Sequence, residues 1–478
     1  MGEKTNKTPR MPKIWEALLV LVFLVAMLAV GIIIYGVDPH VPMLLGVAGA
    51  AALAWRLGYK WDEIEKFMVN GISKAMQSIM ILVVIGVLIG VWLDSGVVPA
   101  MIYYGLHILK PQIFFIATVL ICSITALATG TSWGTMGTMG VALMGIGIGL
   151  GMNPAMTAGA ILSGAYFGDK MSPLSDTTNL APAMSGTDLM SHIKFMIVPT
   201  AIVYVVTLVI FGVLGASQYS GGEADLSKVV LYEDSIADIF NINPMLLLPP
   251  VIVIVAVALK VPAIPGIALG ILAGAVVGVI YQPDCSIGTL FECGMNGYVC
   301  ATGIEEIDDL LSSGGLMNMM FSVSMTIIAM MFGGIMEATH QLEVIVDKIK
   351  GLVKGPAGLV GLTEVTCVVS NAVMPEQYIS IVVPGRMYAE EYKKRGLSAT
   401  SLSNALESSG TVTSALIPWN TCGVFITSTL GISAIQYAPY AFFNWLMPIG
   451  CFILAVLGVA VADQNGVRLS KKKKSNNA

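Results

Sequence analysis

The sequence predicts an all-α polytopic membrane protein with about ten transmembrane helices, two re-entrant hairpins and two inverted repeats that contain broken helices. Its 478 residues are 56% hydrophobic and only 12% charged, with a mean hydropathy of +0.81, which does not suit the surface of a soluble protein. Apolar runs long enough to cross a hydrocarbon core of about 30 Å recur along the chain. The two halves of the chain, separated by an acidic linker, also repeat one order of elements, as many transporters do.

Three crossing helices are expected before the first interruption of the apolar pattern. Their apolar runs occupy residues 14–36, 41–57 and 76–94, and each is long enough to span a bilayer. The first run follows a basic stretch, as the core of a signal peptide does, but it is too long and lacks a cleavage site of small residues. We therefore expect it to be retained as the first transmembrane helix.

Residues 112–150 form two short apolar runs around the polar sequence ATGTSWGTMG. This pattern predicts a re-entrant hairpin whose polar tip reaches the midplane, because irregular backbone at membrane depth is tolerated where it lines a cavity. A helix that begins near residue 154 is expected to cross inward, with a break between Gly168 and Pro182. Residues 193–214 then cross outward to the linker.

The second half of the chain echoes the first. Gly90 and Asp94 are matched by Gly333 and Glu337 at one common offset, and Pro173 is matched by Pro418 at nearly that offset. The second hairpin is accordingly expected at about residues 357–387. Since the first half starts inside and the second half starts outside, the two repeats are inverted, which is typical of secondary transporters.

Charge placement divides and orients the chain. The expected segments are a first transmembrane repeat (residues 1–215), an extracytoplasmic linker (216–243), an inverted second repeat (244–465) and a basic cytoplasmic tail (466–478). The linker is acidic, whereas Lys and Arg gather in segments that the positive-inside tendency places in the cytoplasm, namely the N-terminus, residues 56–66, 347–354 and 386–395, and the tail. The sequence therefore predicts a multi-pass inner-membrane protein with both termini cytoplasmic.

Polar residues gather at the hairpin tips and helix breaks. Unwound backbone and hydroxyls offer the oxygen donors that a hard cation such as sodium prefers. The candidate ion and proton ligands of the first repeat are Asp169, Asp176, Ser175, Thr177, Thr178, Asn179, Thr129, Thr131 and Ser132. Those of the second repeat are Asn371, Glu376, Glu407, Ser408, Asn420 and Thr421. For any single hydroxyl, the simpler interpretation is that small residues let helices approach closely.

The carboxylates of the first break carry the sharpest hypothesis. Asp169 and Asp176 are seven residues apart, so they would share one face of a continuous helix and could line one cavity. A carboxylate there can bind sodium when ionised and a proton when neutral, and we expect the two cations to compete for both aspartates. Lys170 leaves two alternatives open, because it could neutralise Asp169 or extend toward an interface.

Two stretches permit a family resemblance. GTSWGTMGTMGVALMGIG and LSGAYFGDKMSPLSDTTNLAPAMSGTDLMSHI closely resemble the NhaC-type sodium/proton antiporter family. The resemblance implies secondary active exchange of sodium for protons by alternating access in a prokaryotic inner membrane, with no enzymatic activity and no cofactor besides the transported ions. No GxxxxGK[ST] motif suggests ATP use. The residues that fall in the family's signature are Asp169, Ser172, Pro173, Ser175, Asp176, Thr177, Thr178 and Asn179.

Other substrates stay open at this point. The family that the chain resembles also contains exchangers that couple the two cations to organic anions such as malate and lactate, and relatives that carry amino acids. An anion would need donors, for which the chain offers the hairpin-tip amides together with Trp133, Asn371, Asn420, Lys170 and Arg386. A channel fits less well, because paired breaks suit alternating access. The expected partners are the lipid bilayer and these small solutes, with a homodimer left open and nothing to suggest nucleic acid.

Overall fold

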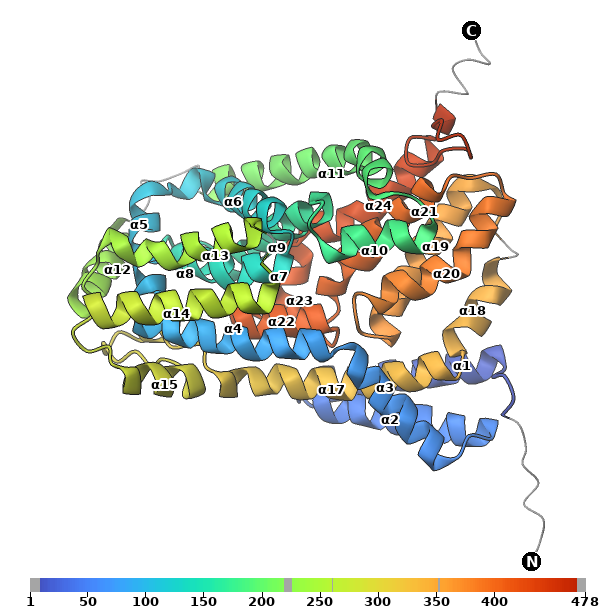
Figure 1. Cartoon of the computed structure of the whole chain (residues 1–478), viewed down its shortest axis with the longest axis horizontal. Coiled ribbons are helices and arrows are strands. Elements are labelled where there is room, and N and C mark those ends of the chain that lie inside the picture. Colours follow the sequence, from blue (N-terminus) through green and yellow to red (C-terminus); the bar gives the residue numbers. More distant parts are fainter. Residues whose placement is uncertain (1–8, 219–225, 260, 351–352, 471–478) are drawn as a thin grey trace, which may run out of the picture.

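The computed structural model describes residues 9–218, 226–259, 261–350 and 353–470 (Figure 1). In this part of the chain, helices are the regular structure, and the only β-pairing is a few isolated bridges. Eight of the described helices are long and apolar enough to cross a membrane, or ten if each of two bent pairs counts as one span. The prediction of an all-α polytopic membrane protein is therefore confirmed. The basic residues Lys471 to Lys474 and the linker residues 219–225 lie outside the described chain.

The first half of the chain forms helices in the predicted order. They are α1 (Ile14–Ala29), α2 (His40–Leu57), α3 (Trp61–Lys74), α4 (Met76–Asp94), α5 (Val97–Ile108), α6 (Phe114–Thr129), α7 (Ser132–Thr135), α8 (Val141–Gly149), α9 (Pro154–Met171), α10 (Asp176–Ser185) and α11 (Leu189–Gln218). A π-helical turn at Val30–Ile34 extends α1, and another at Met136–Gly140 joins α7 to α8.

The second half repeats the series after α12 (Leu226–Ile239), a helix within the linker. Its helices are α13 (Leu248–Ala258), α14 (Ala263–Tyr281), α15 (Ile287–Asn296), α16 (Glu305–Leu311), α17 (Leu316–Ala338), α18 (Gln341–Lys350), α19 (Gly355–Val373), α20 (Ile379–Lys394), α21 (Ala399–Leu406), α22 (Thr421–Leu430), α23 (Ala434–Tyr437) and α24 (Phe442–Val456). A π-helical turn at Glu407–Thr411 continues α21.

Two helical hairpins enter the molecule from opposite ends, as Figure 1 shows. We call the end that holds α12 and α15 the linker end, and the opposite end, toward which α18 and α21 lie, the terminal end. The first hairpin is α6 with α7 and α8, and its arms lie toward the linker end. The second is α19 with α20, whose arms extend toward the terminal end. Both hairpins occur where the sequence predicts them.

Helices α4 and α17, which the sequence predicts to be equivalent in the two halves, run in opposite directions. The Gly315 amide donates to the Gly86 carbonyl over 2.7 Å, whereas Gly71 in α3 lies against Met330 and Gly334 near the far end of α17. The α3–α4 segment therefore runs antiparallel to α17. A Cβ atom on Gly71 would lie 2.2 Å from the Met330 carbonyl oxygen, so glycine is what permits this close helix approach.

The breaks in the long helices are shorter than predicted. Helix α9 ends at Met171 and α10 begins at Asp176, so the first interruption covers residues 172–175, and Pro182 lies inside α10. Ser172, the first residue of this interruption, connects it with α6, because its hydroxyl donates to the Leu127 carbonyl at 2.8 Å. In the second half, α21 passes through its π-helical turn and resumes as α22 after residues 417–420.

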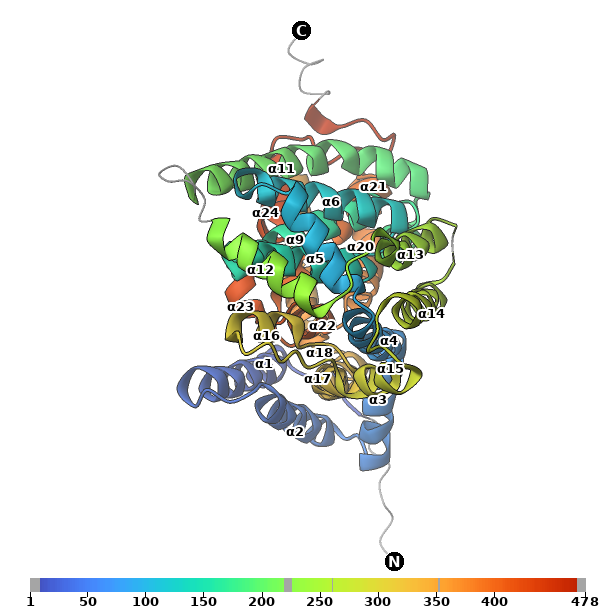
Figure 2. The same ribbon diagram turned by 90° about the vertical axis from the view of Figure 1, so that its left-hand side faces the viewer.

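Several short helices were not predicted. No helix was predicted to begin in the basic segment 56–66, but α3 begins at Trp61, and the Glu63 carboxylate accepts the Lys60 amide at 2.8 Å, as a helix-capping residue does. The linker likewise contains α12. These segments are amphipathic and carry charges, so a search for long apolar runs passes over them. Figure 2, viewed from the linker end, places α1 and α2 on one flank of the molecule and α11 on the opposite flank.

Candidate functional site

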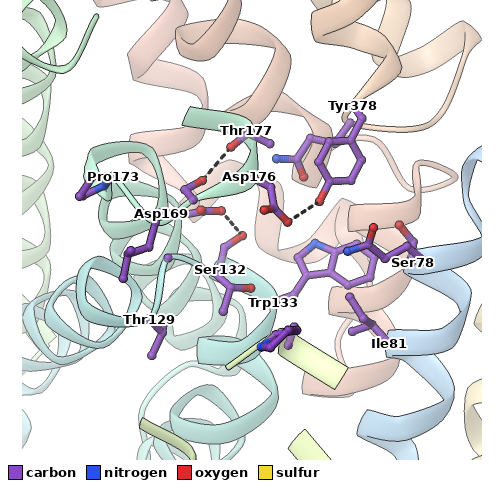
Figure 3. Close-up of a pocket in the computed structure, with 18 of the residues that line it drawn as sticks. Ser78, Ile81, Thr129, Ser132, Trp133, Asp169, Pro173, Asp176, Thr177 and Tyr378 are labelled. Carbon is purple, nitrogen blue, oxygen red and sulfur yellow. Dashed lines mark hydrogen bonds between the residues drawn. The ribbon is translucent and has the colours of Figure 1, made fainter. Parts of the chain in front are cut away.

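A cavity of about 460 Å³ lies where the interrupted elements meet. Its wall is built by the tip of the first hairpin, the break between α9 and α10, the tip of the second hairpin, the first turn of α4 and the turn between α13 and α14. Segments from both halves of the chain therefore form one site (Figure 3).

Asp169, in the last turn of α9, is the most enclosed carboxylate of the first break. Its side chain is 5% exposed, and the Ser132 hydroxyl donates to Oδ2 at 2.7 Å. Ser132 begins α7, and the preceding Thr131 caps this helix by accepting the Gly134 amide at 3.2 Å. Chain geometry at the hairpin tip thus aims a hydroxyl at the carboxylate (Figure 3).

Asp176 faces the same cavity from the other side of the break. It is the first residue of α10, where the partial positive charge of a helix N-terminus favours a carboxylate. The preceding Ser175 caps the helix, since its hydroxyl oxygen accepts the Thr178 amide. Asp176 is exposed, and the Tyr378 hydroxyl donates to its Oδ2 at 3.5 Å. Asp169 and Asp176 therefore share one cavity although the helix between them is broken.

Glu376, at the tip of the second hairpin, supplies a third carboxylate. It is buried, it lines the cavity, and its Oε2 has no hydrogen-bond partner within the described chain. Among the described residues that line the cavity, none is Lys, Arg or His. The cavity is therefore anionic, with Asp169, Asp176 and Glu376 on three different segments.

Four further candidates of the first repeat line this cavity: Thr129, Thr131, Ser175 and Thr177. The Thr129 hydroxyl donates to the Thr125 carbonyl at 2.8 Å, which leaves its oxygen lone pairs free to face a cation. Ser175 and Thr177 share a hydrogen bond of 3.1 Å between their hydroxyls (Figure 3). The hydroxyl oxygens thus surround the carboxylates from several directions.

Thr178 and Asn179 do not line the cavity but hold the broken backbone. The Thr178 hydroxyl lies 3.2 Å from the Asp169 carbonyl and 3.0 Å from the Lys170 carbonyl, to which it can donate. The Asn179 amide donates to the carbonyls of Pro173 and Ser175, at 3.0 and 2.7 Å. These bonds satisfy carbonyls that the interruption would otherwise leave without partners.

Asn371, Asn420 and Thr421 form a buried cluster behind the second hairpin tip. The Asn371 side-chain amide donates to the Gly410 backbone carbonyl at 2.8 Å. The Asn420 side-chain amide donates to the Asn371 backbone carbonyl at 3.0 Å. The Thr421 backbone amide donates to the Pro375 backbone carbonyl at 3.0 Å. The structure therefore places these three residues between tip and break and not on the cavity wall.

Glu407 and Ser408 lie deeper, beside Lys170. The Lys170 ammonium donates to the Ser408 hydroxyl at 3.2 Å, and the Thr177 hydroxyl donates to Glu407 Oε1 at 3.2 Å. Lys170 is fully buried. Both alternatives for Lys170 were therefore wrong: it neither pairs with Asp169 nor extends to an interface, because adjacent residues of a helix such as α9 point about 100° apart around its axis.

A second cavity of about 570 Å³ adjoins the first. The two share Gln77, Asp176, Glu376 and Tyr378 in their walls. The second wall adds Arg386 of α20 and an ion pair between Lys74 Nζ and Glu337, at 2.5 Å. Because α20 continues from this point to the terminal end, the pair of cavities leads from Asp169 in that direction.

Several residues of the cavity wall were not predicted from the sequence. Gln377 and Tyr378 follow Glu376 at the hairpin tip, where their position alone could have suggested them. Gln77 and Ser78 are the polar residues that open the apolar run of α4, and they were taken as part of the run. The turn at Val261, Pro262 and Ala263 carries no polar side chain, so no signal marks it.

A comparison with protein families decides the relationship. The model of the family described as "Na+/H+ antiporter family" matches residues 5–166 and 164–459. The chain belongs to the Na+/H+ antiporter family. This confirms the resemblance drawn from the sequence, and it makes the chain a multi-span membrane transporter and not an enzyme.

Three relatives cover nearly the whole chain. The chain is 36% identical to "Na(+)/H(+) antiporter NhaC" of Alkalihalophilus pseudofirmus, over 94% of this chain and 97% of the relative. It is 37% identical to "Malate-2H(+)/Na(+)-lactate antiporter" of Bacillus subtilis, over 95% and 96%. It is also 37% identical to "Arginine/ornithine antiporter ArcD" of Halobacterium salinarum, over 94% and 92%. Members of comparable similarity thus carry different solutes.

Proposed function

We propose that this protein is a sodium/proton antiporter that exchanges the two cations at Asp169 by alternating access. The observation that carries the proposal is the anionic cavity, in which three carboxylates face one space with no Lys, Arg or His among its described lining residues. Such a wall attracts cations and repels a free anion. Membership of the Na+/H+ antiporter family supports the same conclusion.

The chemistry of exchange follows from the donor set. Sodium is a hard cation that prefers oxygen ligands, and Asp169 with Ser132 offers a carboxylate and a hydroxyl 2.7 Å apart. An ionised Asp169 can bind sodium, whereas a protonated Asp169 cannot offer the same charge. Asp169 therefore carries one cation or the other, which couples the two flows. Glu376 and Asp176 complete the anionic wall, and Ser175 and Thr177 supply further oxygens.

The hydroxyls at the first hairpin tip also connect cation binding with movement of the protein. Thr129 and Thr131 line the cavity beside Ser132, so movement of the tip would change the number of ligands around the cation. Residues 1–215 and 244–465 would then act as the two inverted repeats whose relative movement exposes the cavity to each side in turn. No bound cofactor is needed, because the two ion gradients supply the free energy.

We propose that the protein spans the inner membrane, or the plasma membrane of a cell that has only one. Its terminal end faces the cytoplasm. The basic residues of α20 and of residues 56–66 lie toward that end, and the acidic α12 lies at the other. This arrangement satisfies the positive-inside tendency. In this orientation, the adjoining cavity with Arg386 connects the site with the cytoplasm.

Coupled exchange of an organic anion is a second candidate function. Lys74 and Arg386 line the adjoining cavity together with Asp176 and Glu376, so a carboxylate could contact cationic groups there while a cation occupies the inner site. The malate and lactate named for the Bacillus subtilis relative are anions of that kind. Lys74 is already paired with Glu337, which makes this candidate the weaker of the two.

Proton movement in proteoliposomes tests the proposal. The full-length protein is reconstituted with a pH-sensitive dye inside the vesicles, and sodium is added outside with and without malate or lactate. Exchange with sodium alone is the expected result. Proton movement that strictly requires the organic acid would support the second candidate and overturn the first, and sodium flux without proton movement would overturn both.

A further inference from the structure

Lys170 is the fully buried ammonium group that neither the cavity wall nor the exchange chemistry uses. It belongs to α9 of the first repeat but reaches into the second repeat, where its Nζ donates to the Ser408 hydroxyl at 3.2 Å. Ser408 in turn donates to Asn404 Oδ1 at 3.4 Å. The side chain ranks among the largest that are fully buried in the described chain.

Two buried carboxylates interact with this ammonium. Glu407, on the π-helical turn next to Ser408, and Glu364, on α19, are both buried and both interact electrostatically with Lys170. Each has one oxygen with no hydrogen-bond partner within the described chain, Oε2 of Glu407 and Oε1 of Glu364. Burying a carboxylate without a compensating cation is costly, so this cluster requires a positive charge.

Among the titratable groups around the cluster, Lys170 is the one that supplies its positive charge. Cys451 of α24 interacts electrostatically with both Lys170 and Glu364, and Asp169 interacts with Glu407. His192 of α11 also faces Lys170, but its Nδ1 is engaged by the Ser403 hydroxyl at 2.8 Å. Among the described residues named here, Lys170 is thus the group that supplies a positive charge to both glutamates.

The cluster is otherwise built like a cation site. Glu407 lies on a helix whose regular hydrogen bonding is interrupted, with Ser408, Ser409 and Thr411 on the same turn, and such turns offer oxygen donors to ions. Glu407 and Ser408 were expected to be ion ligands because they lie at such a break. In the structure, the space beside them holds the end of the Lys170 side chain.

We propose that Lys170 is a tethered cation that fills the polar cluster of the second repeat, so that each chain carries a single exchangeable sodium, at Asp169. The inference rests on the proposed function and adds its stoichiometry. Thr177 lines the cavity and donates to Glu407 Oε1, which connects the permanently occupied cluster with the exchangeable site. The second repeat therefore contributes a fixed charge where a symmetric transporter would bind a second ion.

Equilibrium binding of radioactive sodium to the purified full-length protein tests the stoichiometry. One sodium per chain is expected for the unmodified protein. In Asp169→Asn, which removes the charge but keeps the shape, the count should fall to zero. A count of two in the unmodified protein, with one remaining in Asp169→Asn, would overturn the inference while leaving sodium exchange intact. No sodium bound to the unmodified protein would overturn the proposed function itself.

Substitution of the lysine separates charge from volume. Lys170→Ala removes the ammonium and opens space, so a second sodium should bind beside Glu407 and Ser408. Lys170→Met removes the charge but fills the space, and its count should stay at one. An unchanged count in a folded Lys170→Ala protein would overturn the role of Lys170. If that variant does not fold, the counts for the unmodified protein and Asp169→Asn still decide between one site and two.

Discussion

At the scale of single residues, the site depends on two neighbours that point in different directions. Asp169 points into the cavity toward Ser132, and Lys170 points away from it toward Ser408. The sequence indicated that both are functional candidates, because charges at membrane depth are costly and usually line a cavity. It could not indicate their directions, since those depend on where α9 lies between the two repeats.

The hydroxyl beside Asp169 should matter to cation affinity. In Ser132→Ala, the carboxylate loses its 2.7 Å hydrogen bond, and a hydrogen bond to a charged group contributes about 1.5–3 kcal/mol. We expect the apparent affinity for sodium to fall about 10- to 100-fold. The sodium dependence of exchange in proteoliposomes measures this change. Ser217, an exposed hydroxyl on α11, serves as the control through Ser217→Ala, and an equal affinity in both variants would contradict the assignment.

Asp176 should contribute less than Asp169. It is exposed at the cavity and its hydrogen bond to Tyr378 is long, at 3.5 Å, so solvent screens its charge. Exposed charge pairs contribute about 0.2–1 kcal/mol, and we expect Asp176→Asn to change sodium affinity by about fivefold or less. The same proteoliposome assay measures it. Complete loss of exchange in a folded Asp176→Asn protein would show that the two aspartates act as one unit.

At the scale of elements, the hairpins and the broken helices could be predicted because their polar interruptions are local. The tip at ATGTSWGTMG and the proline-containing breaks stand out in apolar surroundings. The short amphipathic helices α3 and α12 could not be predicted from apolar runs, and neither could the turn between α13 and α14 that closes the cavity. These elements are placed by packing between distant segments, for which one sequence carries no local signal.

The first hairpin tip needs glycine for two reasons. Gly130 has a φ of +70°, and a Cβ atom there would lie 2.7 Å from carbon atoms of Leu174 at the break. Gly151 has a similar φ of +68° but open space around it. In both Gly→Ala variants the left-handed backbone costs about 1–2 kcal/mol, and at Gly130 the overpacking adds about 1–3 kcal/mol.

Thermal unfolding in detergent compares the two variants. Gly130→Ala should unfold at a lower temperature than Gly151→Ala, and it should also exchange sodium more slowly, because the tip that carries Ser132 is displaced. Equal midpoints and equal rates would show that the tip does not pack against the break as the structure has it.

At the scale of the whole molecule, the two adjoining cavities show toward which end of the protein the site opens in the described conformation. They connect Asp169 with Arg386 through Tyr378 and Gln77, toward the terminal end. In the proposed orientation this is an inward-open state. The antiparallel packing of α4 against α17 is what two inverted repeats require, and in the proposed scheme such repeats would provide a second arrangement with the opposite opening.

Accessibility from each side tests this direction. In Gln77→Cys, a membrane-impermeant thiol reagent should label the new cysteine in vesicles with the cytoplasmic face outward, and sodium should slow the labelling. Asn241→Cys, an exposed position at the linker end, should be labelled only in vesicles of the opposite orientation. Labelling of both cysteines from one side would contradict the proposed topology.

The central claim is that one carboxylate, Asp169, carries sodium and protons in turn. The most direct measurement is sodium-driven proton movement in proteoliposomes that contain Asp169→Asn, compared with the unmodified protein at equal amounts of folded protein. The account predicts that exchange is lost, because the amide offers neither the negative charge for sodium nor a site for the proton. Exchange that continues at the unmodified rate would contradict it.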